Sequence, residues 1–261
     1  MITREKLKTD AKGVLSHTYW MSFASQLIVS TIVSMITSAV FAITYVATIL
    51  LQMVVAVPIA LISQDEETAV IATLLLSPSG LIIFAAVMAI TICLSCPAQV
   101  GLHYFYIKSR NTLKPDIGDV FQPFKTNYKN VVFTSFMMVL RIWLWSLLFT
   151  IPGIIKSLEY WMVAYIVAEN PNINYKRALE ISSKTMNGEK AFAFVLGLSF
   201  IGWIMLCMLT WGIGAMFLPP YVSATNTEYY LYLKNKAISN GYADPSEFTR
   251  DGTAAPAAAT V

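Results

Sequence analysis

Long apolar runs, separated by short charged segments, dominate the chain. No charged residue occurs between Trp20 and Gln64 or between Thr68 and Ile107, and further apolar runs follow. A transmembrane helix needs about 20 predominantly apolar residues. The pattern therefore predicts an all-α fold, a polytopic membrane helix bundle. We expect six transmembrane helices, paired as three hairpins, near residues 21–45, 82–107, 131–151, 153–168, 191–210 and 211–233.

The first apolar run is too long for a single span. A helix from Trp20 to Gln64 would be about 67 Å long at about 1.5 Å per residue, against about 30 Å of hydrocarbon. With six spans, all basic residues except Arg141 and Lys156 fall on one side, which the positive-inside tendency makes cytoplasmic. Splitting the run in two would place the basic loop 108–129 outside. We therefore expect cytoplasmic termini and an apolar extracellular insertion, helical or a hairpin, at about 46–79.

Three regions follow from this topology. Residues 1–19 are predicted to form a basic amphipathic helix at the membrane interface, and residues 20–236 the six-span membrane domain. The remainder, 237–261, is predicted to be a disordered cytoplasmic tail, because it is rich in Ala, Thr, Pro and Asp and lacks periodicity.

The cytoplasmic segments before the first, third and fifth spans are amphipathic. Asp116 is a predicted N-cap of the second segment, and Gly188 can end the third. At the interface such helices would bury their apolar faces among acyl chains and hold Lys and Arg near anionic headgroups, so anionic bilayer lipids are predicted partners. Ordinary connecting helices would show the same pattern, and this alternative stays open. The apolar stripes are Leu7, Ala11, Val14 and Leu15; Ile117, Val120, Phe121 and Phe124; and Tyr175, Ala178, Leu179, Ser182 and Met186.

Composition agrees with this interpretation. Hydrophobic residues make up 56% of the 261 residues and charged residues 13%, against about 45–50% and about 25% in soluble domains. This excludes most soluble enzymes, disordered chains and nucleic-acid partners. The net charge of +3 decides little by itself.

Charged residues inside the predicted spans are the first candidates for a polar site. Each costs at least about 2.5 kcal/mol at the centre of a membrane helix, so such residues usually face protein or water. Arg141 lies midway along the third span, and Lys156 and Glu159 lie on the fourth, across a predicted Ile151-Pro152-Gly153 turn. We hypothesise an Arg141–Glu159 pair, and a structural salt bridge is favoured over a substrate site.

Other polar and helix-breaking residues complete this candidate intramembrane site. Adjacent prolines remove two backbone donors, so the sixth helix is expected to be broken, as in many transporters or in a centrally packed kinked helix. The additional polar candidates are Gln99, His103, Asn226 and Glu228, and the helix-break positions are Pro97, Pro152, Gly153, Pro219 and Pro220.

Signatures of soluble-type chemistry are missing from the sequence. It contains no G-x-S-x-G, H-E-x-x-H or phosphate-binding G-x-x-x-x-G-K motif, so we predict no catalytic residue, metal site or cofactor. Cys93 and Cys96 could form a redox pair, but packing beside Pro97 is the favoured interpretation. His103, without partner ligands, is expected to be a core residue.

Several stretches together resemble a known bacterial family. The motifs are Arg4-x-x-Leu7-Lys8-x-x-Ala11-Lys12, Pro97-x-x-x-Gly101, Asp119-Val120-Phe121-x-x-Phe124, Ile151-Pro152-Gly153-Ile154 through Tyr165-Ile166-Val167-Ala168-Glu169, Ala178-Leu179-x-x-Ser182-x-x-x-Met186-x-Gly188, Pro220-Tyr221 and Thr227-Glu228-Tyr229-Tyr230. The chain resembles integral membrane proteins of the domain of unknown function 975 family and, more distantly, the membrane domain of some bacterial glycerophosphodiester phosphodiesterases. The resemblance implies a six-helix protein of the bacterial cytoplasmic membrane and supplies no catalytic residues.

The sequence thus favours a non-enzymatic accessory protein for lipid or peptide handling or envelope stress. A small-molecule or ion transporter that uses the same polar interior is the alternative, and an intramembrane enzyme using Cys93 and Cys96 ranks third. Besides lipids, a second copy of the chain or other membrane proteins are the expected partners.

Overall fold

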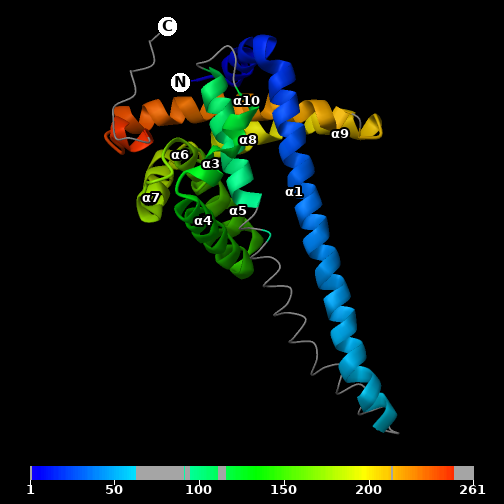
Figure 1. Ribbon diagram of the computed structural model, residues 1–261. Coiled ribbons are helices and arrows are strands. Elements are labelled where there is room, and N and C mark those ends of the chain that lie inside the picture. The colour runs from blue at the N-terminus through cyan, green and yellow to red at the C-terminus, as the bar shows by residue number, and fades with distance from the viewer. Residues whose placement is uncertain (1, 63–90, 92–94, 111–115, 213, 250–261) are drawn as a thin grey trace. The chain divides into compact units, whose positions relative to one another are not determined.

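The computed structural model describes residues 2–62, 91, 95–110, 116–212 and 214–249, and helices joined by short turns make up these ranges (Figure 1). No strand occurs in these ranges. The chain divides into two compact units, Met1–Val29 with Cys96–Val261, and Ser30–Ser95. The following paragraphs concern the first unit, except where α1 continues into the second.

The first helix, α1, runs without interruption from Arg4 to Ile62. No glycine or proline occurs between Gly13 and Pro58, so nothing in the backbone ends the helix earlier. No break separates residues 1–19 from the predicted first span. The predicted insertion at 46–79 is helical as far as Ile62, and its remainder lies outside the described residues.

Within the described residues, four segments are long and apolar enough to cross a membrane: Arg4–Leu50, Tyr128–Leu148, Thr150–Glu169 and Lys190–Leu209. The all-α character expected from the hydrophobic pattern is thus confirmed, and the four apolar helices agree with a membrane protein. The predicted span 82–107 lies partly outside the described residues, where only residues 91 and 95–110 are helical. The predicted span 211–233 falls in α10, Gly214–Ser239, which is not one of the four.

Shorter helices build the rest of the first unit. Two predicted spans are each divided in two: the fourth by a turn at Tyr160–Met162, and the fifth by a turn at Ser199–Phe200. The elements are η1 Ile117–Phe121, α3 Gln122–Lys125, α4 Tyr128–Leu148, α5 Thr150–Glu159, α6 Val163–Glu169, α7 Tyr175–Met186, α8 Lys190–Leu198, α9 Ile201–Leu209 and η2 Pro245–Phe248.

The α4–α5 hairpin turns at Phe149, three residues before the predicted Pro152-Gly153 turn. Phe149 is extended (φ −159°, ψ 148°), and helix α5 begins at Thr150. Pro152 lies in the first turn of α5, where a missing N–H costs little, so it does not break the helix. Gly153 instead allows close packing, because a Cβ there would lie 2.1 Å from Ser146 Oγ on α4.

The predicted apolar stripe on α7 is confirmed, but it faces protein. Ala178, Leu179 and Met186 are almost fully buried, and α7 packs against α4, α5, α6 and α10. The helix ends where predicted, because Gly188 takes the left-handed conformation at φ +87°. On α1, Leu7 and Ala11 are equally buried. These stripes are therefore unavailable to acyl chains, and the interfacial interpretation is wrong for these faces.

The segment before α4 is only partly as predicted. Asp116 does cap it, since its side chain accepts a hydrogen bond from Gly118 N at 3.0 Å. The expected single helix is instead the 3₁₀ turn η1 followed by the one-turn α3, which has Pro123 near its start. Val120 is buried, whereas Phe121 and Phe124 are exposed.

Helix α10 is continuous through Pro219 and Pro220, so the predicted broken helix is wrong. Both prolines lie in its second turn. Their missing N–H groups would have bonded the carbonyls of Ala215 and Met216, so only the N-terminal end of the helix loses hydrogen bonds.

The C-terminal region is ordered beyond residue 237, contrary to the predicted tail. Helix α10 ends at Ser239, η2 follows, and Phe248 is buried. Glu247 accepts hydrogen bonds from Arg177 Nε at 2.7 Å and Nη2 at 3.1 Å. The bidentate ion pair fixes this segment on α7, and the Phe248 ring packs beside Lys234 of α10. Residues 250–261 lie outside the described part.

This docking should depend on pH. The Arg177 hydrogen bonds hold the pKa of the Glu247 carboxyl below its ordinary value, so the pair stabilises the docked segment above the unfolded pKa of about 4.3 and is lost as pH falls through the lowered value. Limited proteolysis at residues 240–249 should therefore be slow at pH 7. Glu247→Gln should accelerate cleavage several-fold, while Glu180→Gln, which removes only an exposed partner of Arg177, should not. Equal cleavage of both variants would contradict the role of the pair.

Candidate functional site

Glu159 is the centre of a buried polar cluster at the end of α5. Its Oε1 accepts hydrogen bonds from Lys156 Nζ at 2.9 Å and Ser183 Oγ at 2.8 Å, and its Oε2 from Lys190 Nζ at 2.8 Å. Its backbone carbonyl accepts from Ser182 Oγ at 2.7 Å. Helix α5 thus supplies a carboxylate and an ammonium group, α8 a second ammonium group, and α7 two hydroxyl groups. We call Lys156, Glu159, Ser183 and Lys190 the Glu159 cluster.

The predicted Arg141–Glu159 pair is wrong. The Glu159 carboxylate is directed to α7 and to the first residue of α8, and both of its oxygens are already bonded there. Arg141 is half-buried on α4 and makes no ion pair within the described ranges. Lys156, which was a separate candidate, pairs with Glu159 as a member of the Glu159 cluster.

The other buried carboxylates are neutralised in the same way. Glu228 pairs with Arg110 at 2.7 Å. The remaining pairs are Glu169 with Lys234, Glu189 with Lys236 and Asp119 with Lys108. The bonds to Glu189 and Asp119 raise the pKa values of Lys236 and Lys108, so both lysines stay charged. Among the described residues, each of these largely buried carboxylate groups therefore has its counter-charge inside the protein.

The remaining predicted site residues are dispersed. Gln99 is exposed, and the His103 ring packs against the Tyr165 ring with centroids 4.0 Å apart. Asn226 lines a separate cavity of about 320 Å³ whose other lining residues are mostly apolar. Pro97 is buried within the helix 95–110. The structure does not bring Gln99, Arg141, Glu159 and Asn226 together.

Within the described residues, no three His, Cys, Asp or Glu side chains are grouped as a metal site would require. Cys93 lies outside the described residues, so its relation to Cys96 is not described.

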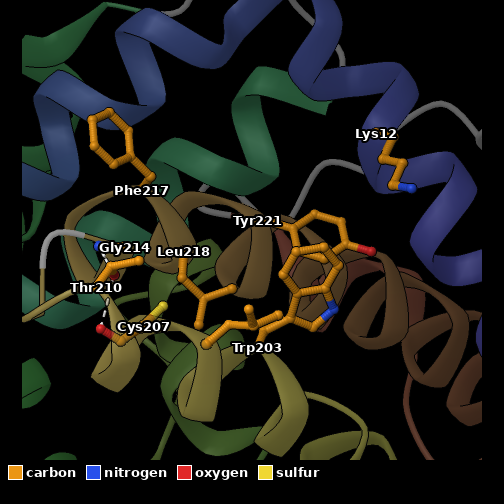
Figure 2. A pocket seen from close by; sticks show the side chains of 9 residues that line it. Lys12, Trp203, Cys207, Thr210, Gly214, Phe217, Leu218 and Tyr221 are labelled. Atoms are coloured by element: carbon orange, nitrogen blue, oxygen red, sulfur yellow. Dashed lines mark hydrogen bonds between the residues drawn. The ribbon is translucent and has the colours of Figure 1, made fainter.

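An apolar pocket of about 460 Å³ lies between α1, α9 and α10 (Figure 2). Trp203, Leu206 and Phe217 on its walls are each about half exposed, so it opens onto the surface of the helices. The Lys12 amine and the Tyr221 hydroxyl lie toward one side of the view, and Phe217, Gly214 and Cys207 toward the other. The lining residues are Lys12, Trp203, Leu206, Cys207, Thr210, Gly214, Phe217, Leu218 and Tyr221.

Lys12 belongs to a basic stripe on α1. Arg4, Lys8 and Lys12 are spaced at i, i+4 and i+8, which places them on one face of the helix. Lys8 Nζ lies 4.8 Å from the centre of the Phe200 ring, at the junction of α8 and α9. In the described part of the chain, no carboxylate lies within ion-pair distance of these three residues.

Most partners of the buried carboxylates were not predicted from the sequence. Glu169, Lys190 and Lys234 lie at or beyond the ends of the predicted spans, where charged residues are common and do not indicate a buried site. One signal was available: Tyr230 and Lys234 are four residues apart on one helix, and both bond Glu169, at 2.6 and 2.7 Å.

Comparison with known families gives a match to a segment that contains the Glu159 cluster. Residues 126–237 match the model of a family described as a protein of unknown function, DUF975. This part of the chain, less than half of its length, is thus similar to the DUF975 family. The DUF975 segment runs from the start of α4 into the last turns of α10, so it contains the whole Glu159 cluster and the α9 and α10 walls of the pocket. Lys12 and Arg110 lie outside it.

No curated protein and no solved structure matches the chain. The more distant similarity to glycerophosphodiester phosphodiesterases is not shown by these comparisons.

Proposed function

We propose that this chain is a non-enzymatic accessory protein of a bacterial cytoplasmic membrane that handles or senses a lipid, a peptide or envelope stress. In this proposal it crosses the membrane six times, as three hairpins, and both termini are cytoplasmic. The observation that carries the proposal is the internal neutralisation of the buried carboxylates, with Glu159 bonded to Lys156 and Lys190 as the clearest case.

A transporter needs polar groups that face a path open to water and change partners during the cycle. Here the buried carboxylates form ion pairs with basic residues of the same chain, which favours a structural role for these charges. The cavity beside Asn226 favours transport, because the Asn226 amide lines an open space of about 320 Å³.

Thiol accessibility separates the two functions. In a variant without the three native cysteines, Asn226→Cys and Ser223→Cys should resist a membrane-impermeant maleimide added from either side. Lys6→Cys, on the exposed face of α1, is the matched control and should react from the cytoplasmic side alone. Reaction at position 226 would contradict the accessory role and support transport. Reaction of the control from outside would contradict the proposed topology.

A further inference from the structure

We propose that the pocket between α1, α9 and α10 binds one acyl chain of an anionic phospholipid, whose phosphate contacts Lys12. This inference rests on the proposed function and deepens it, because it names the ligand class and the residues that recognise it.

The shape and lining of the pocket fit an acyl chain. Its volume of about 460 Å³ is within the range of about 300–1,000 Å³ for small-molecule sites. Leu206, Phe217 and Leu218 provide an apolar wall. Thr210 adds little polarity, because its hydroxyl donates to the Cys207 carbonyl at 2.9 Å and accepts from Gly214 N at 3.2 Å.

The polar groups lie where a headgroup would be needed. The Lys12 amine and the Tyr221 hydroxyl are on the same side of the pocket in Figure 2, away from Gly214 and Cys207. A ligand that fills the pocket must therefore be apolar at one end and able to accept hydrogen bonds at the other. A phospholipid meets both requirements.

The basic residues of α1 beside the pocket favour an anionic lipid over a zwitterionic one. Every buried carboxylate named above has a basic partner, whereas Arg4, Lys8 and Lys12 have no carboxylate within ion-pair distance in the described residues. Three like charges spaced four residues apart repel one another. An anionic headgroup beside Lys12 would relieve this repulsion, and a zwitterionic headgroup would do so less.

The open side of the pocket allows entry from the bilayer. Trp203, Leu206 and Phe217 combine pocket contact with substantial exposure, and in a membrane-spanning bundle exposed apolar side chains face lipid. A lipid tail can enter sideways without passing through water. A peptide or a soluble phosphate would lack this route.

Photolabelling tests the assignment directly. The protein is placed in phosphatidylcholine bilayers containing a trace of phosphatidylglycerol with a diazirine on one acyl chain, or the matched photoreactive phosphatidylcholine. Irradiation and peptide mass spectrometry then locate the adducts. We expect phosphatidylglycerol to label the peptides of residues 201–221 more strongly than phosphatidylcholine does.

The charge of Lys12 should control this labelling. Lys12→Gln should lower phosphatidylglycerol labelling of residues 201–221 about five-fold, which corresponds to about 1 kcal/mol for one basic residue near an anionic surface. Phosphatidylcholine labelling should not change. Lys6→Gln removes the same charge from an exposed position of α1 that does not line the pocket, and should have no effect. Leu218→Trp, which fills the pocket, should abolish labelling by both lipids.

Two results would overturn the inference, and only the second would also weaken the proposed function. In the first, phosphatidylglycerol labels other parts of the protein strongly, and its labelling of residues 201–221 is weak or independent of Lys12. The protein would then still handle lipid, but at a different site. Uniform labelling of all exposed helices by both lipids would also remove the support for lipid as the ligand of the proposed function.

Discussion

Gly101→Ala is expected to prevent stable folding. A Cβ at this position would lie 1.8 Å from the carbonyl oxygen of Val120 and 2.8 Å from its carbonyl carbon. These are backbone atoms of η1, which cannot rotate out of the way as a side chain can. The helix 95–110 and the segment after it would have to separate, so we expect a cost above the roughly 1–3 kcal/mol of ordinary overpacking.

The separation would also strain an ion pair that joins the same two elements. Lys108 Nζ lies 2.8 Å from Asp119 Oδ1. Gly13→Ala is the matched control, since a Cβ on that part of α1 meets no atom within 4 Å and should stabilise the helix by about 0.5–1 kcal/mol. Yield of monodisperse protein and thermal unfolding in detergent measure both effects. Normal yield and stability for Gly101→Ala would contradict the close approach of helix 95–110 to Val120.

Glu159→Gln is expected to lower the free energy of unfolding by about 3 kcal/mol. Removing one partner of a buried ion pair leaves the other charge without compensation, which typically costs about 3–5 kcal/mol. Here two ammonium groups, Lys156 and Lys190, lose their shared carboxylate. Thermal or denaturant unfolding of the purified protein in detergent measures the loss.

Two control substitutions make this result specific. Glu180→Gln removes a carboxylate that is bonded to Lys184 and Arg177 but exposed, so it should leave stability unchanged. Arg141→Gln distinguishes the structure from the sequence-based hypothesis. It should not destabilise the protein, whereas an Arg141–Glu159 pair would make it as damaging as Glu159→Gln.

Helical character and local caps were predictable from the sequence. Long runs without charge predict apolar helices, because a backbone segment inside a bilayer can satisfy its hydrogen bonds only within a helix or a closed barrel. Asp116 and Gly188 act through their own side chain or backbone conformation, so the caps that they form could be identified from neighbouring residues alone. The buried stripe on α7 was likewise visible as a spacing of three and four residues.

Partners across helices were not predictable. The sequence shows that the charge of Glu159 would be unfavourable inside an apolar helix. The direction of its side chain, however, depends on how α5 packs against α7 and α8. The Pro152-Gly153 motif marked the α4–α5 hairpin correctly but misplaced its turn, because proline is tolerated in the first turn of a helix. Gly101 belonged to a motif noted in the sequence, and only its approach to Val120 explains why glycine occurs there.

Burial of the amphipathic faces changes where lipid contact is expected. Leu7 and Ala11 on α1 face the protein, so these faces cannot insert among acyl chains. On the same helix, Lys12 lines an apolar pocket and has no carboxylate within ion-pair distance in the described part of the chain. Lipid recognition is therefore proposed at one defined pocket and not along the surface helices.

The central claim, that this is an accessory protein that holds a membrane ligand, is tested most directly by native mass spectrometry. The protein is extracted in its native lipid and released from the carrier in the spectrometer, so that retained molecules add to its mass. We predict a protein carrying about one anionic phospholipid or a peptide, with lipid retention reduced by Lys12→Gln and unchanged by Lys6→Gln. A protein that carries no lipid or peptide, or that retains a small polar solute instead, would contradict the account.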